Sequence, residues 1–119
     1  MSLRRKKVLL VYENVNEMEE AEKYLISNGY QTSKANELEN AYMSAIDMAP
    51  DLIVLNLSKN VHEIELFNKK ITASIHKKVE LLNIVDLESY LRITVNEHVA
   101  IKPVKPGLLL HLVRLIAKN

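Results

Sequence analysis

Short aliphatic runs alternate with longer segments of helical periodicity along the whole chain. The runs at residues 8–11, 50–58, 79–85 and 99–101 predict buried strands, and the weak alternation over residues 30–35 predicts an edge strand. The segment 50–58 reads PDLIVLNLS, in which four large aliphatic residues follow one another without interruption. Such a run is typical of a central strand that is covered by helices on both faces.

Helical periodicity fills the intervals between the predicted strands. Asn14 or Asn16 is suited to cap the first helix, and Gly29 to end it. Asn36 is suited to cap the second helix, which Pro50 ends. The inward face of the first helix is expected to consist of Met18, Ala21 and Leu25.

The second half of the chain predicts three further helices. The first of these extends from Val61 towards Ile75, and residues 86–94 allow only a short helix after it. Pro106 is placed well for the start of the final helix. In the short helix the expected inward residues are Leu87, Tyr90 and Leu91. In the final helix they are Leu108, Leu109, Leu112, Leu115 and Ile116.

Strand and helix therefore alternate five times over 119 residues, without a repeat, a low-complexity tract or a linker. This order predicts an α/β protein, with one domain over residues 1–119 and a five-stranded parallel sheet. Right-handed crossovers between parallel strands favour a doubly wound arrangement.

Composition excludes several classes of function. A formal charge of +1 argues against direct binding of nucleic acid, and the absence of cysteine excludes disulfides, thiolate metal sites and cysteine nucleophiles. No apolar segment reaches the length of about 18 residues that a membrane span needs, so we expect a cytoplasmic protein with no membrane partner. The four histidines lack metal-ligand spacing, and with two glycines the chain has no glycine-rich phosphate loop.

Polar residues stand where the predicted strands end. Parallel α/β sheets bind ligands in the crevice beyond the carboxyl ends of their strands, so these residues form a candidate site. A polar strand end also satisfies backbone groups, which explains any one of these residues taken alone. The candidate residues are Tyr12, Glu13, Asn56, Asn83, Lys102 and Pro103.

Four stretches of the chain resemble the response-regulator receiver domain of two-component signalling: VLLVYEN, Gly29-Tyr30, PDLIVLNLS and IKPVKPGLLLHLVRLI. The resemblance covers nearly the whole chain and implies the flavodoxin-like receiver fold with strand order 2-1-3-4-5. It also implies a role in phosphorelay signalling. In that family the first strand ends in two acidic residues, the central strand in a phosphoaccepting aspartate, the fourth in serine or threonine, and the fifth in Lys-Pro. Glu13, Lys102 and Pro103 fit this pattern.

The other positions depart from the family. Tyr12 replaces an acidic residue, Asn56 replaces the phosphoacceptor, and Asn83 stands about where the hydroxyl residue belongs. Val99 takes the place of a switch aromatic. An amide is a poor nucleophile, so this degenerate pocket predicts a pseudo-receiver without phosphotransfer at Asn56 and without enzymatic activity.

Magnesium binding is expected to be lost or weak, so no cofactor is predicted. In the family three carboxylates and one lysine leave two negative charges for a divalent cation, whereas Glu13 and Lys102 leave none. We expect an ion pair between Glu13 and Lys102, with Asn56 hydrogen-bonded nearby. Asp51 is excluded as a substitute acceptor because it starts the same strand, roughly 16 Å from Asn56.

The resulting hypothesis is a binding module that recognises another protein, or a second copy of itself, independently of phosphorylation. By resemblance, its contact surface includes Tyr90, Val99, Leu110 and His111. One alternative is a receiver that is phosphorylated at an atypical acceptor such as Asp86, although Asp86 also suits a helix N-cap. Another is a small-ligand sensor, in which Asn56 and Asn83 provide hydrogen bonds.

Overall fold

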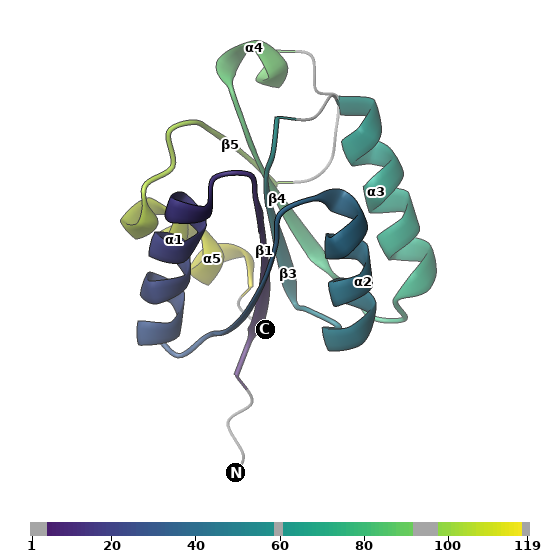
Figure 1. The fold of residues 1–119 in the computed structure, drawn as a ribbon, viewed down its shortest axis with the longest axis horizontal. Helices are drawn as coiled ribbons and strands as arrows, with labels where there is room; N and C mark the ends of the chain where they lie inside the picture. The colour runs from purple at the N-terminus through teal and green to yellow at the C-terminus, as the bar shows by residue number, and fades with distance from the viewer. Residues whose placement is uncertain (1–4, 59–60, 92–97, 118–119) are drawn as a thin grey trace.

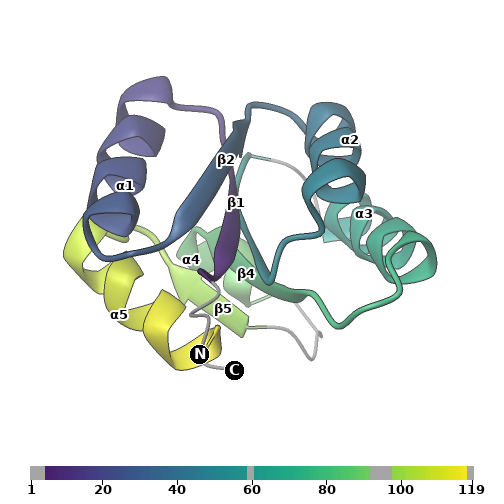
Figure 2. The same ribbon diagram turned by 90° about the horizontal axis from the view of Figure 1, so that it is seen from below.

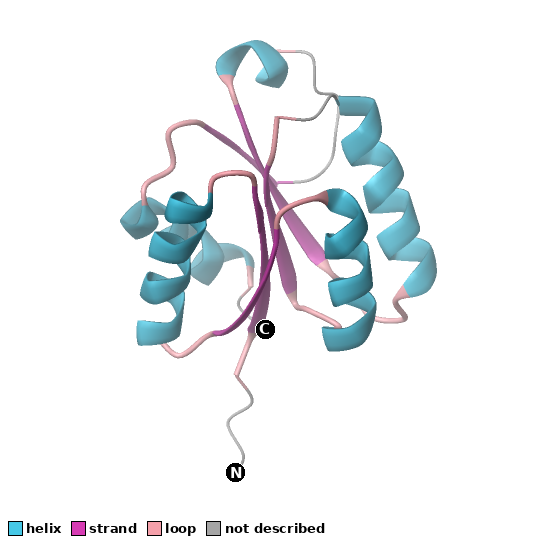
Figure 3. Ribbon diagram, in the orientation of Figure 1, coloured by secondary structure: helices cyan, strands magenta, loops and turns pink. Residues whose placement is uncertain are grey.

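The computed structural model describes residues 5–58, 61–91 and 98–117, and strands and helices alternate along them (Figure 1). The strands are β1 (Lys7–Tyr12), β2 (Gln31–Ala35), β3 (Leu52–Asn56), β4 (Glu80–Val85) and β5 (His98–Ile101). The helices are α1 (Val15–Ser27), α2 (Leu38–Met48), α3 (Val61–Ser74), α4 (Leu87–Tyr90) and α5 (Pro106–Ile116). Figure 3 shows this alternation by secondary-structure type.

All five strands form one parallel sheet in the order β2-β1-β3-β4-β5. The predicted α/β class, the parallel sheet and the strand order 2-1-3-4-5 are therefore confirmed. The chain reverses its direction of winding between β1 and β3, and in their shared register Tyr12 lies opposite Asn56. These two residues stand at the carboxyl ends of adjacent strands.

Helices cover both faces of the sheet: α1 and α5 lie on one side and α2 and α3 on the other (Figure 2). Along β3, Leu52 and Val54 pack towards α1 and α5, whereas Ile53 and Leu55 pack towards α2 and α3. Each of these four side chains is at most 2% exposed. The uninterrupted aliphatic run of β3 thus reflects burial on both faces, where each side chain contributes roughly 1.5–3 kcal/mol.

The ends of α1 follow the sequence prediction. Asn14 caps the helix by accepting a hydrogen bond from the backbone N–H of Glu17 at 3.0 Å. Gly29 adopts a φ of +92°, a conformation that glycine accepts without steric cost. Its N–H donates to Ile26 and that of Tyr30 to Leu25, which together form a Schellman motif.

The predicted cap of α2 is wrong. Glu37, and not Asn36, is the N-cap residue, and its side chain makes no capping hydrogen bond. Asn36 lies two residues before the first helical residue, Leu38, so it does not occupy the position from which a cap reaches the first free N–H groups.

The predicted inward face of α4 is also wrong. Leu87, Tyr90 and Leu91 are 59%, 46% and 76% exposed. The helix has four residues and lies beyond the carboxyl end of β4, so it does not cover the sheet (Figure 1). Residues 92–94 of the predicted helix lie outside the described residues.

The inward face of α5 is rotated from the predicted one. Leu108 and Leu115 are 47% and 52% exposed, whereas Leu110 and Val113 are buried. Leu109 is buried as predicted, and Leu112 and Ile116 are half-buried and pack against the same core, also as predicted. Contact between α5 and α1 fixes this orientation, and Arg114 donates a hydrogen bond to the side chain of Asn28 at the end of α1.

Candidate functional site at the carboxyl end of the sheet

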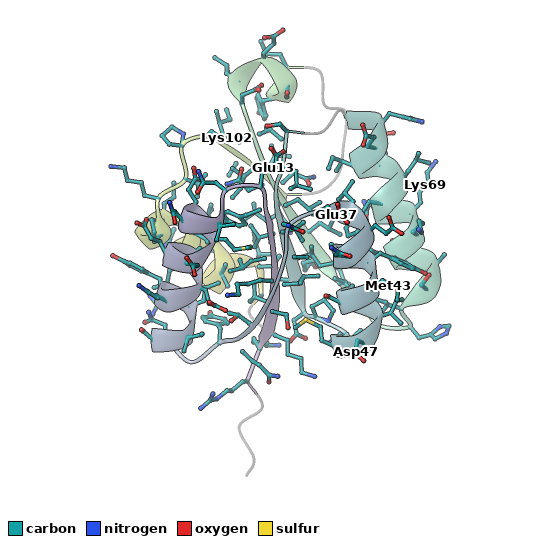
Figure 4. All side chains as sticks on the ribbon, viewed as in Figure 1. Glu13, Glu37, Met43, Asp47, Lys69 and Lys102 are labelled. Atoms are coloured by element: carbon teal, nitrogen blue, oxygen red, sulfur yellow. The ribbon has the colours of Figure 1, made fainter. Side chains whose placement is uncertain are left out.

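A crevice of about 390 Å³ lies between the first turns of α1 and the segment that joins β5 to α5. It forms at the carboxyl ends of β1 and β3, where the winding of the sheet reverses and where α/β proteins commonly bind ligands. Five of the six predicted site residues line it: Tyr12, Glu13, Asn56, Lys102 and Pro103. Figure 4 labels Glu13 and Lys102, which approach this end of the sheet from β1 and β5.

Tyr12 forms the buried floor of the crevice. Its side chain is 3% exposed, and Asn56 lies opposite it on β3. Burial, followed by the negative charge of Glu17, raises the pKa of the Tyr12 phenol well above its usual value, while the neighbouring Asn56 amide, as a hydrogen-bond donor to the phenolate, acts in the opposite direction. The floor therefore remains uncharged at physiological pH.

Asn56 connects this floor to α1. Its Nδ2 donates to Glu17 Oε2 at 3.4 Å, so the amide occupies the space between Tyr12 and the helix. Glu17 was not among the predicted site residues. Its position in the first turn of the helix that follows β1 could have indicated its place at the crevice, since that turn starts at the same end of the sheet.

The predicted ion pair between Glu13 and Lys102 is absent from the described part of the chain. Glu13 instead accepts a hydrogen bond from the backbone N–H of Ser58, just after β3, and its own N–H donates to the Asn56 carbonyl at 3.3 Å. These contacts hold the Glu13 carboxylate against the β3 side of the crevice. Lys102 is exposed, and its backbone N–H donates to Val85 at 2.7 Å.

Asn83 does not reach the crevice. The strand β4 continues to Val85, so Asn83 lies within the strand, opposite Leu55 and Val99. Its side chain is on the same face as Leu81, which packs towards α2 and α3, and it is 5% exposed. Its Oδ1 has no hydrogen-bond partner. The prediction assigned Asn83 to a strand end because strand register is not visible in the sequence.

Asp86 and Asp51 also lie outside the crevice lining. Asp86 is the N-cap of α4 and accepts a hydrogen bond from the Ser89 N–H at 2.7 Å, which confirms the alternative role expected for it. Asp51 lies just before β3, where it bonds to Lys7 at the amino ends of the strands. Neither residue is among those that line the crevice with Asn56.

The predicted contact surface is altered by one residue. Tyr90 and His111 are exposed and Val99 is half-buried, but Leu110 is 9% exposed and belongs to the core between the sheet, α1 and α5. Leu110 is therefore not available to a partner. The reason is the rotation of α5, which turns Leu108 and Leu115 outwards in its place.

The donors of the crevice do not fit the magnesium ion that receiver domains use. Mg²⁺ demands near-octahedral oxygen coordination, with carboxylates among its ligands. Here a phenol and an amide replace two carboxylates at the strand ends, and the Glu13 carboxylate is engaged by the Ser58 N–H. The other carboxylates of the lining, Glu17 and Glu20, are on α1, and Glu17 is bonded to Asn56. Across residues 5–58, 61–91 and 98–117, no group of three or more histidine, aspartate or glutamate residues is arranged to hold a metal ion.

No model of a known protein family matches the chain, and no curated protein matches it either. Solved structures do. The chemotaxis protein CheY4 of Vibrio cholerae superposes with a TM-score of 0.77 at 20% identity, covering 95% of this chain and 99% of that one. The receiver domain of a sensor histidine kinase of Pseudomonas aeruginosa, with magnesium coordinated in its active-site cleft, gives a TM-score of 0.76 at 20% identity, covering 98% of this chain and 100% of that one.

A third similar structure belongs to a family of redox sensors of the streptococci that evolved from two-component response regulators. Its TM-score is 0.79 at 20% identity, and the alignment covers 94% of this chain and 51% of that one.

In the described residues no helix is both long and apolar enough to cross a membrane. The sheet order and the solved structures together show that the chain has the flavodoxin-like fold of response-regulator receiver domains.

Proposed function

We propose that this chain is a receiver-like domain of two-component signalling that acts by binding another protein and is not phosphorylated at Asn56. The observation that carries the proposal is the arrangement of three side chains at the centre of the crevice: Asn56 lies opposite Tyr12 and donates a hydrogen bond to Glu17. We assign to the Asn56 amide the position at which a receiver domain has its phosphoaccepting carboxylate.

Chemistry supports this assignment. A phosphoaccepting carboxylate attacks phosphorus with an oxygen lone pair, whereas the nitrogen lone pair of an amide is delocalised and its oxygen is weakly nucleophilic. The buried phenol of Tyr12 and the engaged Glu13 also leave the ends of β1 and β3 without the free carboxylates that Mg²⁺ prefers. The fold is thus retained while the groups that perform phosphoryl transfer are replaced.

The exposed flank of α5 is the surface that we assign to the partner. Leu108 and Leu115 are seven residues apart, so they project from the same side of the helix about two turns from each other. His111 is exposed between them. Arg114, on another side of the helix, bonds to Asn28 of α1, and the leucine flank therefore points away from that contact. The partner is a second protein, or a second copy of this chain, with a complementary apolar surface.

Incubation with a small-molecule phosphodonor and Mg²⁺, read by intact mass, tests the loss of phosphorylation. We expect no adduct on the wild-type chain. A stable adduct that is lost in Asp86→Ala would contradict the proposal, and would assign phosphorylation to Asp86 despite its role as an N-cap. A receiver domain with all its acidic residues serves as the positive control for the donor.

The surface is tested with matched leucines. Leu115→Glu introduces a charge on the proposed surface, and Leu66→Glu introduces the same charge on α3, where the leucine is 48% exposed compared with 52% for Leu115. We expect the first substitution to disrupt a complex, measured by sedimentation of the chain alone or with a captured partner. Equal behaviour of the two variants would reject this surface.

A further inference from the structure

The two walls of the crevice carry opposite charges that do not neutralise each other. On the α1 side lie Glu17 and Glu20, and on the side that joins β5 to α5 lie Lys102 and Lys105. Among the residues that the structure describes, no ion pair joins the two walls. Glu13 also lines the crevice, where its carboxylate accepts from the Ser58 N–H, and Glu17 accepts from the Asn56 side chain through one oxygen, Oε2. Acidic residues therefore line one side of the crevice and lysines line the other.

The rest of the lining is neutral. Tyr12 is buried at the floor, opposite Asn56. Ala21, Pro103 and Val104 add apolar surface at the sides. The volume of about 390 Å³ lies in the range of roughly 300–1,000 Å³ that is typical of small-molecule sites.

We propose that the crevice binds a free zwitterionic α-amino acid with an apolar side chain. Its ammonium group would lie at Glu17 and Glu20, and its carboxylate at Lys102 and Lys105. The apolar side chain would lie against Pro103 and Val104. The proposal goes beyond the signalling function above, and its test involves neither a phosphodonor nor a protein partner.

The balance of charge favours a zwitterion over the other small molecules of this size. A phosphate or a nucleotide would meet the two lysines but would also meet the carboxylates of α1. A polyamine would meet those carboxylates but also the two lysines. A molecule that carries both charges close together pairs with both walls at once, and a pocket that contacts both discriminates against analogues that lack one of them.

The test is a binding screen of the intact chain with each of the twenty amino acids at about 10 mM, read by thermal melting and confirmed by calorimetry. At least one apolar amino acid should raise the melting temperature with a saturable concentration dependence. Its decarboxylated amine and its deaminated acid should each bind at least roughly tenfold more weakly, because each leaves one charged wall unpaired.

Substitutions of charged residues on the two sides of the crevice provide a second test of the proposal. Glu17→Gln and Lys102→Gln should each weaken binding of that amino acid by about tenfold or more. Asp47→Asn on α2 and Lys69→Gln on α3 remove the same charges at exposed positions outside the crevice, and they should leave the affinity unchanged (Figure 4). The proposal is overturned if no amino acid gives a saturable shift, if a singly charged analogue binds equally well, or if the wall and control variants behave alike.

Discussion

Tyr12 and Asn56 lie opposite each other at the carboxyl ends of β1 and β3, and both side chains line the same crevice. Both stand where the receiver pattern has acidic residues. The two replacements are therefore neighbours, and Glu17 is bonded to the second of them, Asn56. Changing Asn56 alone to aspartate would place a carboxylate beside Glu17, which now accepts a hydrogen bond from the Asn56 amide.

The Asn56→Asp substitution should lower stability without restoring phosphorylation. The new carboxylate would lie beside Glu17 and would lose the Nδ2 donor that now bridges the two groups. At this exposed contact we expect a loss of about 1 kcal/mol at neutral pH, since solvent screens the repulsion. Urea unfolding measures it.

Glu17→Gln is the matched second change in a double-mutant cycle. If repulsion between carboxylates is the cause, Asn56→Asp should cost less in the Glu17→Gln background than in the wild type. Ready phosphorylation of Asn56→Asp by a small-molecule donor would show that the rest of the crevice still supports the chemistry, against the proposed function.

Tyr12 should make the chain sensitive to alkaline pH. Its folded pKa is raised, so above about pH 10 the unfolded tyrosine loses its proton while the folded one retains it. The unfolded state then binds fewer protons, and stability falls as the pH rises. Tyr12→Phe should reduce this fall, as measured by urea midpoints between about pH 8 and 11.

Tyr24→Phe is the control for that experiment, because Tyr24 is 48% exposed on α1 and lies outside the crevice lining. It should show the same alkaline loss as the wild type. An identical pH dependence of stability in Tyr12→Phe and Tyr24→Phe would mean that burial of the Tyr12 phenol does not cause the loss of stability at alkaline pH.

The sheet could be predicted from the sequence because the pattern of its central strand agrees with the alternation of strands and helices around it. Four consecutive aliphatic residues in a short segment favour a strand that is covered on both faces, and β3, between two helical layers, shows this arrangement. The ends of α1 were equally clear, since Asn14 and Gly29 act through local backbone geometry. Local chemistry of this kind does not depend on the rest of the fold.

The orientation of α5 could not be predicted because apolar residues occupy too much of its circumference. Leu108, Leu110 and Leu115 look alike in the sequence, and the contact with α1 decides which of them is buried. Asn83 and Glu17 were misplaced or missed for a related reason. The first depends on strand register and the second on where a helix starts relative to the sheet, and both are tertiary properties.

The orientation of α5 predicts losses of stability of very different size for two similar substitutions. Leu110→Ala should cost roughly 2–5 kcal/mol of unfolding free energy, because it leaves a cavity in the core. Leu108→Ala, at a residue that is 47% exposed, should change stability by about 0.5 kcal/mol or less. Urea unfolding distinguishes them, and a larger loss in Leu108→Ala would indicate that the helix faces the sheet as first predicted.

Asp51 should be important for stability although it lies far from the crevice. Its Oδ2 accepts the backbone N–H of Lys7 at 2.8 Å and its Oδ1 accepts from Lys77 Nζ at 3.0 Å, so it links the starts of β1 and β3 to the segment before β4. The side chain is 14% exposed, which keeps water from replacing these bonds fully. Asp51→Ala should cost about 2–3 kcal/mol, since it leaves a backbone N–H without its charged acceptor.

Lys77→Met tests the ion pair between Asp51 and Lys77 separately from the bond of Asp51 with the Lys7 backbone. It keeps the aliphatic stem of the lysine and removes only the ion pair, so we expect a loss of less than about 1 kcal/mol, because the lysine side chain is 32% exposed. Urea unfolding at low and high salt measures both variants. The loss in Lys77→Met should shrink with salt, while most of that in Asp51→Ala should persist. Equal losses in the two variants would assign the stabilisation to the ion pair and not to the bond with the Lys7 backbone.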